Sequence, residues 1–340
     1  MNKVVGAALG ALAGYALVRA ITPRYSFRGK RVLITGGSKG LGLVLARTLV
    51  KEGAQVALLA RSEEELEHAA TDLRNRYGVE ALTLTCDVRD EAAVVAAIEQ
   101  VSTVFGGLDV LVNNAGVIQA GPFENLDNAD FENALATHLW GPLYAIRASL
   151  PHLRASGGRI LNIASVGGLV GVPHLASYSA SKFALVGLSD ALRAELASKG
   201  VKVTTACPWL MRTGSHYNAQ LKGQHVKEFT LFALADALPG SSMNAETAAR
   251  RCVEALRSGK ARVAIGSQAK AAHLVDTLFP DLAKAGLELT NQALPSAATS
   301  NQVKTGWEVK NDAPLVPSIL TRLADKAGVR NNETPRSDSM

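Results

Sequence analysis

The chain has 340 residues, of which 47% are hydrophobic and 19% charged, with a net charge of +6 and an isoelectric point near 9.2. This composition excludes an intrinsically disordered chain and predicts a globular protein with a sizeable core. The positive charge would suit nucleic acid, an anionic membrane surface or a phosphate-bearing cofactor, but the absence of basic runs interleaved with aromatic residues argues against nucleic acid.

The three cysteines, Cys86, Cys207 and Cys252, are odd in number and widely spaced, and none belongs to a CxxC pair. Such spacing indicates neither a disulfide framework nor a zinc site. We therefore expect no bound metal and a reducing compartment.

An uncharged stretch, VVGAALGALAGYALV at residues 4–18, is followed by Arg19 and further basic residues up to Arg31. It is only marginally long enough to span a membrane, yet its glycines recur every fourth residue, as in packed membrane helices. We expect residues 1–28 to contain a hydrophobic helix that anchors the chain. The basic residues after it then keep the rest on the cytoplasmic face of the membrane. The alternatives are a signal peptide or an alanine-rich helix of a cytoplasmic protein.

From residue 30 onward, short strand-like runs alternate with helical stretches. Most runs are apolar throughout, as expected for strands covered by helices on both faces. The seven runs are RVLIT (31–35), QVALLA (55–60), ALTLT (81–85), LDVLV (108–112), RILNIAS (159–165), VKVTTAC (201–207) and ARVAI (261–265). They predict one α/β domain over residues 29–268, built on a doubly wound parallel sheet of about seven strands.

A glycine-rich turn, GGSKGLG, joins the first run to the helix expected at 41–52. Its glycines, Gly36, Gly40 and Gly42, have the spacing GxxxGxG. Glycine is needed where the chain turns sharply and where the backbone approaches a pyrophosphate, and the following helix N-terminus offers free amides to the anion. Many connectors are glycine-rich, but a turn placed between strand and helix predicts a dinucleotide site.

The end of the second run indicates which dinucleotide binds. An acidic residue there would bind the ribose 2′-hydroxyl of NAD, but the sequence LLARSEEE has Ala60 at that place, followed by Arg61. Lys39, in the turn, is expected to reach the same place. Two cations and no carboxylate favour NADP(H) over NAD(H), the alternative being that both are solvated surface charges.

The stretch SYSASKFALVGLSDAL (177–192) carries Tyr178 and Lys182 on one face of a helix. An ammonium beside a phenol lowers the pKa of the phenol from about 10 toward the working pH, which makes tyrosine a usable acid and base. Ser165, which ends the fifth run, is placed to donate a hydrogen bond to a substrate oxygen. Each residue alone could be a cap or a packing residue, but together behind a nucleotide turn they predict a catalytic group.

Four motifs, in this order, resemble the classical branch of the short-chain dehydrogenase/reductase family: TGGSKGLG, NNAG (113–116), NIAS (162–165) and YSASK (178–182). The resemblance covers residues 29–265 and implies a Rossmann-type fold and an enzyme acting on CH–OH or C=O groups. It implies that Tyr178 is the general acid/base, that Lys182 binds the nicotinamide ribose and that Ser165 steadies the reacting oxygen. An extended-branch epimerase or dehydratase is disfavoured, because its turn would read GxxGxxG.

The resemblance also implies the cofactor contacts. Asp87, in CDV, matches the acid that holds the adenine, and the NNAG loop matches the segment beside the adenosine ribose. The expected cofactor-binding set is Gly36, Ser38, Lys39, Gly40, Leu41, Gly42, Arg61, Asp87, Val88, Asn114, Ala115, Gly116, Tyr178, Lys182, Pro208 and Thr213.

The sequence departs from the family pattern at two positions. Trp209 stands where a glycine usually follows Pro208, and His138 stands where the family has an asparagine that anchors a proton-relay water. A neutral imidazole can both donate and accept hydrogen bonds, so we expect His138 to be a catalytic residue of a modified relay. The alternative is that the site has lost turnover and keeps only the nucleotide fold.

The segment after the sixth run is expected to cover the substrate, because ligands of such sheets sit beyond the carboxyl ends of the strands. Its apolar residues are Trp209, Leu210, Met211, Tyr217, Phe229, Leu231 and Phe232. They favour a lipophilic alcohol or ketone, or else they pack the lid or a subunit interface.

Residues 269–340 form a C-terminal extension outside the strand–helix alternation. We expect a helix over 269–292, a loop over 294–318, a short amphipathic helix near 316–327 and a flexible polar end.

Together these observations predict an NADP(H)-dependent oxidoreductase that interconverts a small-molecule carbonyl and an alcohol. The family resemblance implies a homo-oligomer formed partly through the Tyr178 helix. The alternative function is a membrane-tethered NADP(H)-binding scaffold or sensor in which His138 marks lost catalysis.

Overall fold

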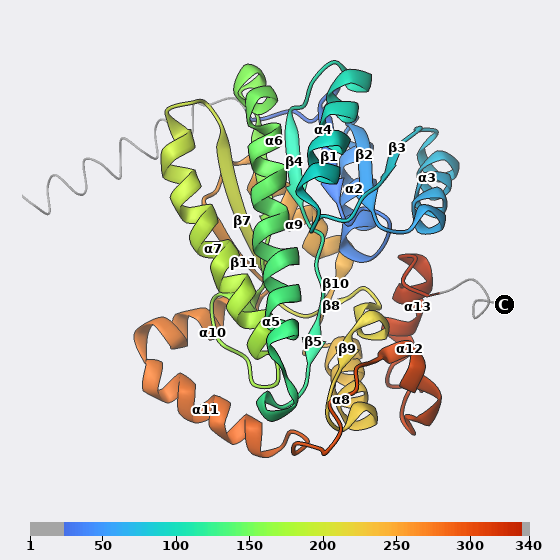
Figure 1. Cartoon of the computed structure of the whole chain (residues 1–340), viewed down its shortest axis with the longest axis vertical. Helices are drawn as coiled ribbons and strands as arrows, with labels where there is room; N and C mark the ends of the chain where they lie inside the picture. Colours follow the sequence, from blue (N-terminus) through green and yellow to red (C-terminus); the bar gives the residue numbers. More distant parts are fainter. Residues whose placement is uncertain (1–23, 335–340) are drawn as a thin grey trace, which may run out of the picture.

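The computed structural model describes residues 24–334. Its centre is a sheet of seven parallel strands in the order β11-β7-β6-β4-β1-β2-β3 (Figure 1). The strands are β1 (Arg31–Thr35), β2 (Gln55–Ala60), β3 (Leu82–Thr85), β4 (Val110–Asn113), β6 (Arg159–Ile163), β7 (Lys202–Pro208) and β11 (Arg262–Ile265). Each lies within two residues of its predicted run, so the predicted Rossmann-type sheet is confirmed.

Helices cover both faces of the sheet because successive strand residues point to opposite sides and both sets are apolar. In β1, Val32 and Ile34 pack with α2, α3 and α9, whereas Leu33 packs with α4, α6 and α7. These helices are α2 (Gly40–Lys51), α3 (Glu63–Tyr77), α4 (Glu91–Phe105), α6 (Gly141–Ser156), α7 (Ala176–Ala197) and α9 (Ala245–Arg257).

The strand order reverses its direction at β1. The chain moves from β1 outward through β2 and β3, then returns to add β4 on the other side of β1. Loops that leave the carboxyl ends of β1 and β4 therefore run in opposite directions, and this switch point is where such sheets bind ligands. The glycine-rich turn follows β1 directly, and the NNAG loop follows β4.

A second layer, the lid layer, lies beyond the carboxyl ends of the strands and has its own apolar core. Phe229 of α8 and Tyr217 pack there against Val309 and Val316 of the C-terminal extension. Tyr217 and Phe229, two of the residues expected to line a substrate site, are thus packing residues of this layer. The layer contains β5 (Gln119–Ala120), β8 (Met211–Arg212), η4 (Ser215–Asn218), β9 (Gln220–Leu221), α8 (His225–Ala237), β10 (Met243–Asn244) and β12 (Lys304–Thr305).

The C-terminal extension differs from its prediction in three places. The helix expected over 269–292 is broken at Phe279 into α10 (Ser267–Leu278) and α11 (Pro280–Gln292), since proline lacks the amide that would continue α10. The expected loop contains β12, α12 (Gly306–Val309) and η5 (Lys310–Asp312). The last helix, α13, spans Arg322–Arg330 rather than 316–327, because a Ser318–Thr321 turn precedes it.

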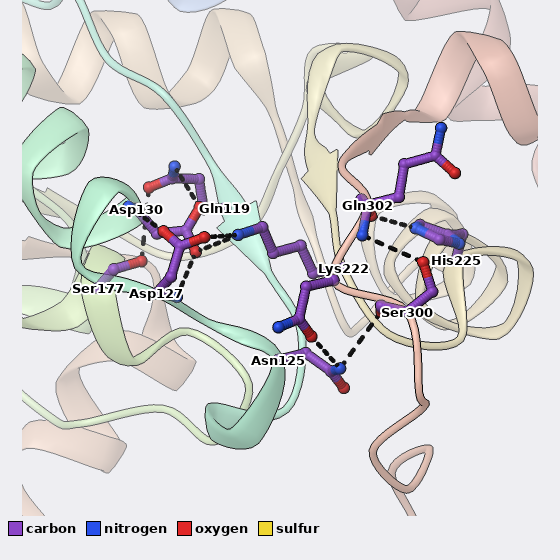
Figure 2. A network of polar contacts seen from close by, with 10 residues as sticks. Gln119, Asn125, Asp127, Asp130, Ser177, Lys222, His225, Ser300 and Gln302 are labelled. Carbon is purple, nitrogen blue, oxygen red and sulfur yellow. Dashed lines mark hydrogen bonds and ion pairs between the residues drawn. The ribbon is translucent and has the colours of Figure 1, made fainter.

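A largely buried polar network links Lys222 of the lid layer to the start of α7 (Figure 2). The ammonium of Lys222, which follows β9, binds the carboxylates of Asp127 and Asp130 at 2.8 and 2.7 Å. Asp130 also accepts a hydrogen bond from Gln119, whose side-chain oxygen accepts one from Ser177 in the first turn of α7. The first turn of α7 is thereby connected to Lys222 in the lid layer. Asp130 belongs to α5 (Asn128–Leu135), which Asp127 caps and which η1 (Phe123–Asn125) precedes. The remaining short helices of the described residues are η2 (Ala136–Trp140) and η3 (Val166–Gly168).

The expected membrane anchor at residues 1–28 falls mostly outside the described residues, as does the polar end after residue 334. Within residues 24–334, no helix combines the length and the apolar character that a membrane span requires.

Candidate functional site

The turn after β1 is shaped by its glycines. Gly36 and Gly40 have φ angles of +62° and +54°, in the left-handed region that favours glycine. A Cβ on Gly42 would lie 1.9 Å from the carbonyl oxygen of Gly36, so the first turn of α2 packs directly on the end of β1. Lys39, the residue before α2, caps the helix with no side-chain hydrogen bond. This is the close backbone packing that a pyrophosphate cradle requires.

The NNAG loop is held against that turn. Thr35 Oγ1 accepts hydrogen bonds from the amides of Asn114 (3.0 Å) and Ala115 (3.1 Å). The side-chain amide of Asn114 in turn donates to the carbonyl oxygens of Thr35 and Gly36. Two segments that are far apart in the sequence thus form one floor at the switch point of the sheet.

The predicted 2′-phosphate site contains a carboxylate that the sequence prediction did not place there. Glu65, in the first turn of α3, accepts hydrogen bonds from Ser38 Oγ (3.0 Å) and from Lys39 Nζ (2.7 Å). This place therefore holds a carboxylate as well as cations, and the prediction of two cations without a carboxylate is wrong. Arg61 stands at the end of β2 as expected, and its side chain is exposed.

The predicted adenine contact, Asp87, forms an ion pair with Arg89 at 2.6 Å. Hydrogen bonds from Arg89 hold the pKa of Asp87 below its usual value, and the nearby Arg61 adds to this effect. The following residue, Val88, contacts Gly141 at the start of α6, where an added Cβ would lie 3.0 Å from the Val88 carbonyl oxygen.

Ser165 and Tyr178 meet at the carboxyl end of β6. The Ser165 hydroxyl accepts a hydrogen bond from the amide of Gly167 at 3.0 Å, and the Tyr178 ring lies against Gly167. Burial raises the pKa of Tyr178, while a hydrogen bond with Ser165 partly offsets this rise. The phenol of Tyr178 is consequently protonated at neutral pH.

Lys182 is buried beneath Tyr178. Its Nζ atom donates a hydrogen bond to the carbonyl oxygen of Ile163 (3.0 Å) and lies 5.6 Å from the centroid of the Tyr178 ring. Burial lowers the pKa of Lys182 to about 7, so the ammonium is only partly populated at neutral pH. The direction is opposite to the expected lowering by this ammonium: burial raises the pKa of Tyr178, and the hydrogen bond with Ser165, rather than Lys182, acts against that rise.

His138 lies in the π-helical segment η2 and is fully enclosed. Its Nε2 accepts the Val117 amide at 3.1 Å, and its Nδ1 lies 2.8 Å from Ser181 Oγ. Since Nε2 is an acceptor, Nδ1 carries the proton and donates to Ser181, which donates to the carbonyl oxygen of Tyr178. Burial and, less strongly, Lys182 hold the pKa of His138 well below its ordinary value. The imidazole is neutral, and both of its nitrogens are engaged.

Trp209 stands where the family usually has a glycine, and its side chain links the end of β7 to the lid layer. Its indole Nε1 donates a hydrogen bond to the carbonyl oxygen of Ser241 at 2.5 Å, and its Cβ packs close to Gly266. Pro208 pairs with Ile265 at the end of β7, and Thr213 is buried with its hydroxyl accepting the Ser215 amide. Within residues 24–334, no group of three or more His, Cys, Asp or Glu side chains is placed to hold a metal ion.

The C-terminal extension brings three further residues to the turn, and the sequence analysis missed all of them. The carbonyl of Asn331 accepts the Gly40 amide at 2.8 Å, Asn332 donates to the Ser38 carbonyl at 3.0 Å, and Glu333 lies against Gly40. The only signal in the sequence is a polar Asn-Asn-Glu group directly after an amphipathic helix.

Comparison with known proteins agrees with this geometry. The family model described as short chain dehydrogenase matches residues 30–222. The chain belongs to the short-chain dehydrogenase family of oxidoreductases. The resemblance seen in the four motifs is thereby confirmed, and with it the prediction of an oxidoreductase.

Several relatives carry reductase or oxidoreductase names. The ketoacyl reductase HetN of Nostoc sp. is 38% identical over 188 residues, which are 55% of this chain and 65% of HetN, just under two thirds of its length. The 3-dehydrosphinganine reductase TSC10B of Arabidopsis thaliana is 36% identical over 246 residues, 71% of each chain. The oxidoreductase SadH of Mycobacterium tuberculosis, named as putative, is 34% identical over 275 residues, 77% of this chain and 96% of SadH.

Solved structures of similar fold include two members of the same family. The L-sorbose reductase of Gluconobacter frateurii, solved in complex with NADPH and L-sorbose, is 26% identical with a TM-score of 0.64 and covers 72% of this chain and 96% of that chain. A short-chain dehydrogenase of Streptomyces avermitilis is 31% identical with a TM-score of 0.65 and covers 79% and 97%.

Proposed function

We propose that the chain is an NADP(H)-dependent oxidoreductase that interconverts a carbonyl and a secondary alcohol, with Tyr178 as the general acid/base. The observation that carries this proposal is the meeting of Ser165, Tyr178 and Lys182 at the carboxyl end of β6. The residues of the turn suit a dinucleotide, since a side chain on Gly36 or Gly42 would fill the cradle.

The protonation states favour carbonyl reduction at neutral pH. A nicotinamide held at this site would supply the hydride for the carbonyl carbon. The Ser165 hydroxyl orients the carbonyl oxygen, and the protonated Tyr178 phenol gives its proton to that oxygen as the C=O bond becomes a C–O bond. Lys182, with a pKa of about 7, then restores the proton to the tyrosine.

Tyr178→Phe tests this assignment. Removing the phenol is expected to lower kcat by about 10²- to 10⁴-fold while the affinity for NADPH stays the same, because only the proton donor is lost. Tyr144→Phe, on α6 beside Trp140, is the matched control and should leave kcat unchanged. Full activity of Tyr178→Phe would refute the proposal, whereas NADPH binding without turnover of any carbonyl by the unaltered chain would favour the alternative of a scaffold or sensor.

The preference for NADP(H) rests on Arg61 and Lys39. We expect Arg61→Ala to weaken NADPH binding about tenfold and to leave NADH binding unchanged, because a charge-assisted contact to the 2′-phosphate is lost. Glu65→Gln should act in the opposite direction, since it releases Lys39 from the carboxylate. Arg154→Ala, at the far end of α6, serves as the control, and equal effects of Arg61→Ala on both cofactors would refute the assignment.

His138 acts here as a positioning residue rather than as a relay. Its two hydrogen bonds link the NNAG loop to the helix that carries Tyr178. We expect His138→Asn to leave the pH profile of kcat unchanged and to lower the melting temperature, because the partly buried Val117 amide or the buried Ser181 hydroxyl loses its partner. A displaced pH profile would instead assign a proton-relay role to His138.

We propose a substrate whose carbonyl is carried on a long aliphatic chain. The names of HetN and TSC10B point to ketoacyl and dehydrosphinganine substrates, and Leu231 offers an exposed apolar side chain on α8. The substrate class is tested by measuring kcat/KM for long-chain β-keto esters and for sugar ketones of the L-sorbose type. Higher kcat/KM for the sugars would contradict the proposal.

The proposed homo-oligomer forms through α7. Phe183 of this helix is 44% exposed, which is high for a large apolar side chain. Sedimentation of the unaltered chain and of Phe183→Ser should show a dimer or tetramer that the substitution weakens, and a monomer in both would overturn this.

A further inference from the structure

The glycine-rich turn of this structure is covered by another part of the same chain. Figure 1 shows α13 next to α3, on the side of the sheet where β2 and β3 lie. The residues after α13 continue onto the turn, and Ser38, Gly40 and Leu41 are all buried. A turn that binds a dinucleotide must be open to it, so the covering segment calls for an explanation.

Three consecutive residues make the contact. The Asn331 carbonyl accepts a hydrogen bond from the Gly40 amide, which is one of the free amides at the N-terminus of α2. Asn332 donates from its side chain to the carbonyl oxygens of Ser38 (3.0 Å) and Glu65 (3.1 Å). Arg47 of α2 binds the Asn331 side chain at 3.0 Å. The segment therefore uses the same backbone that a pyrophosphate would approach.

Glu333 fills the space that Gly40 leaves open. A Cβ on Gly40 would lie 2.3 Å from Oε1 of Glu333, so the carboxyl group sits where the missing side chain would be. The carboxyl group is buried and accepts a hydrogen bond from Asn218 Nδ2 at 2.6 Å. Burial raises its pKa to about 7, while Lys39 acts in the opposite direction. Such a group has the acceptor oxygens, and when ionised the charge, of a phosphate at a helix N-terminus.

The contact is built into the fold. Asn332 has a φ of +59°, a conformation that turns the chain back toward the turn and that asparagine tolerates better than most residues. Gly214 allows α13 to approach, because a Cβ there would lie 2.4 Å from the Cα of Gly328. Helix α13 is also fixed by the hydrogen bond from Tyr217 to Asp325 and by the ion pair of Arg330 with Glu246.

We propose that the segment Asn331–Glu333 is an autoinhibitory occupant of the cofactor site, which NADP(H) must displace from the turn before it binds. This inference rests on the proposed function only in so far as the site takes a dinucleotide. The segment and the cofactor compete for the Gly40 amide and for the space beside Gly40, and an ionised Glu333 repels a phosphate at that place. The segment can leave while α13 keeps its own contacts, since its hydrogen bonds to the turn lie after the helix.

Affinity for the cofactor measures the competition directly. A protein whose binding-competent state is only partly populated has its affinity reduced by that fraction. Asn332→Ala removes two anchoring hydrogen bonds without changing charge, and Glu333→Gln removes the negative charge. In the full chain we expect each to tighten NADPH binding, measured by titration calorimetry, on the order of tenfold. Glu288→Gln, an exposed residue of α11, is the control and should change nothing.

Hydrogen exchange supplies a second measurement that does not depend on the variants. Saturating NADPH should speed the exchange of the Glu333 amide, which donates to the Gly328 carbonyl, while the amides within α7 become slower or stay unchanged. Unchanged or weaker NADPH affinity in both variants, or slower exchange at Glu333 on binding, would overturn the proposal, because the segment would then belong to the bound site. Failure of the unaltered chain and of both variants to bind NADPH would instead overturn the dinucleotide function itself.

Discussion

Replacing Glu333 with glutamine is expected to change how the stability of the chain depends on pH. Burial raises the folded-state pKa of Glu333 from 4.5 to about 7. Between these values the folded chain holds a proton that the unfolded chain has lost, so the free energy of unfolding falls as pH rises through this window. Glutamine does not titrate, and the variant should lack this fall.

The two pKa values set an upper limit on the effect. A difference of this size corresponds to about 3 kcal/mol, fully expressed above pH 7 and absent below about pH 4.5. The measured change will be smaller if the segment Asn331–Glu333 detaches first, since detachment exposes the ionised Glu333 to water without unfolding the rest of the chain. Lys39, Glu65, Asn218 and His216 face the carboxyl group, and their charges and dipoles contribute to the same pKa.

Urea denaturation at pH 4.5, 6 and 8 tests this expectation. Relative to the unaltered chain, Glu333→Gln should become progressively more stable as pH rises, whereas the exposed Glu288→Gln should follow the unaltered chain at every pH. A constant difference between Glu333→Gln and the unaltered chain across the three values would refute the reasoning. It would mean that Glu333 titrates in the folded chain as it does in water.

Two further changes probe other parts of the site. Gly42→Ala should abolish measurable NADPH binding and lower the melting temperature, because the new Cβ would lie 1.9 Å from the Gly36 carbonyl oxygen. The control is Gly187→Ala on α7, where a Cβ has open space around it. NADPH binding by Gly42→Ala would show that this turn is not the pyrophosphate site. Lys222→Met should destabilise the chain by about 3–5 kcal/mol, because it leaves the buried Asp130 carboxylate without its ion pair. The double change of Lys222→Met with Asp130→Leu should recover part of that loss in urea denaturation, and no recovery would show that the charge of Asp130 is not the cause.

The sheet could be predicted from the sequence because each of its strands is a short apolar run. Residues such as Val32, Leu33 and Ile34 are buried on both faces, so no polar residue interrupts the pattern. The shape of the turn at Gly42 and the proximity of Tyr178 to Lys182 were also predictable, since both depend on local spacing, whereas the catalytic role of the pair stays a proposal. Residue type and short-range geometry are enough in these cases.

Other contacts at the site could not be predicted, because they join polar residues far apart in the chain. Asn332 and Ser38 are separated by 294 residues, and an asparagine in a polar segment carries no signal of its partner. Glu65 is one of three consecutive glutamates, and only its place three residues after the capping Ser62 sets it apart. The Glu65 carboxylate forms an ion pair with Lys39, and the helix pattern alone does not specify this partner.

The apolar core that the lid shares with the C-terminal extension determines how the chain can be shortened. Phe229 is fully buried, and residues from 307 to 316 are part of the apolar cluster that encloses it. A chain that ends at residue 268, the border of the strand–helix alternation, would expose this aromatic surface to water and invite aggregation. The extension therefore completes the apolar core of the lid layer, and the folding unit is longer than the seven-stranded sheet with its helices.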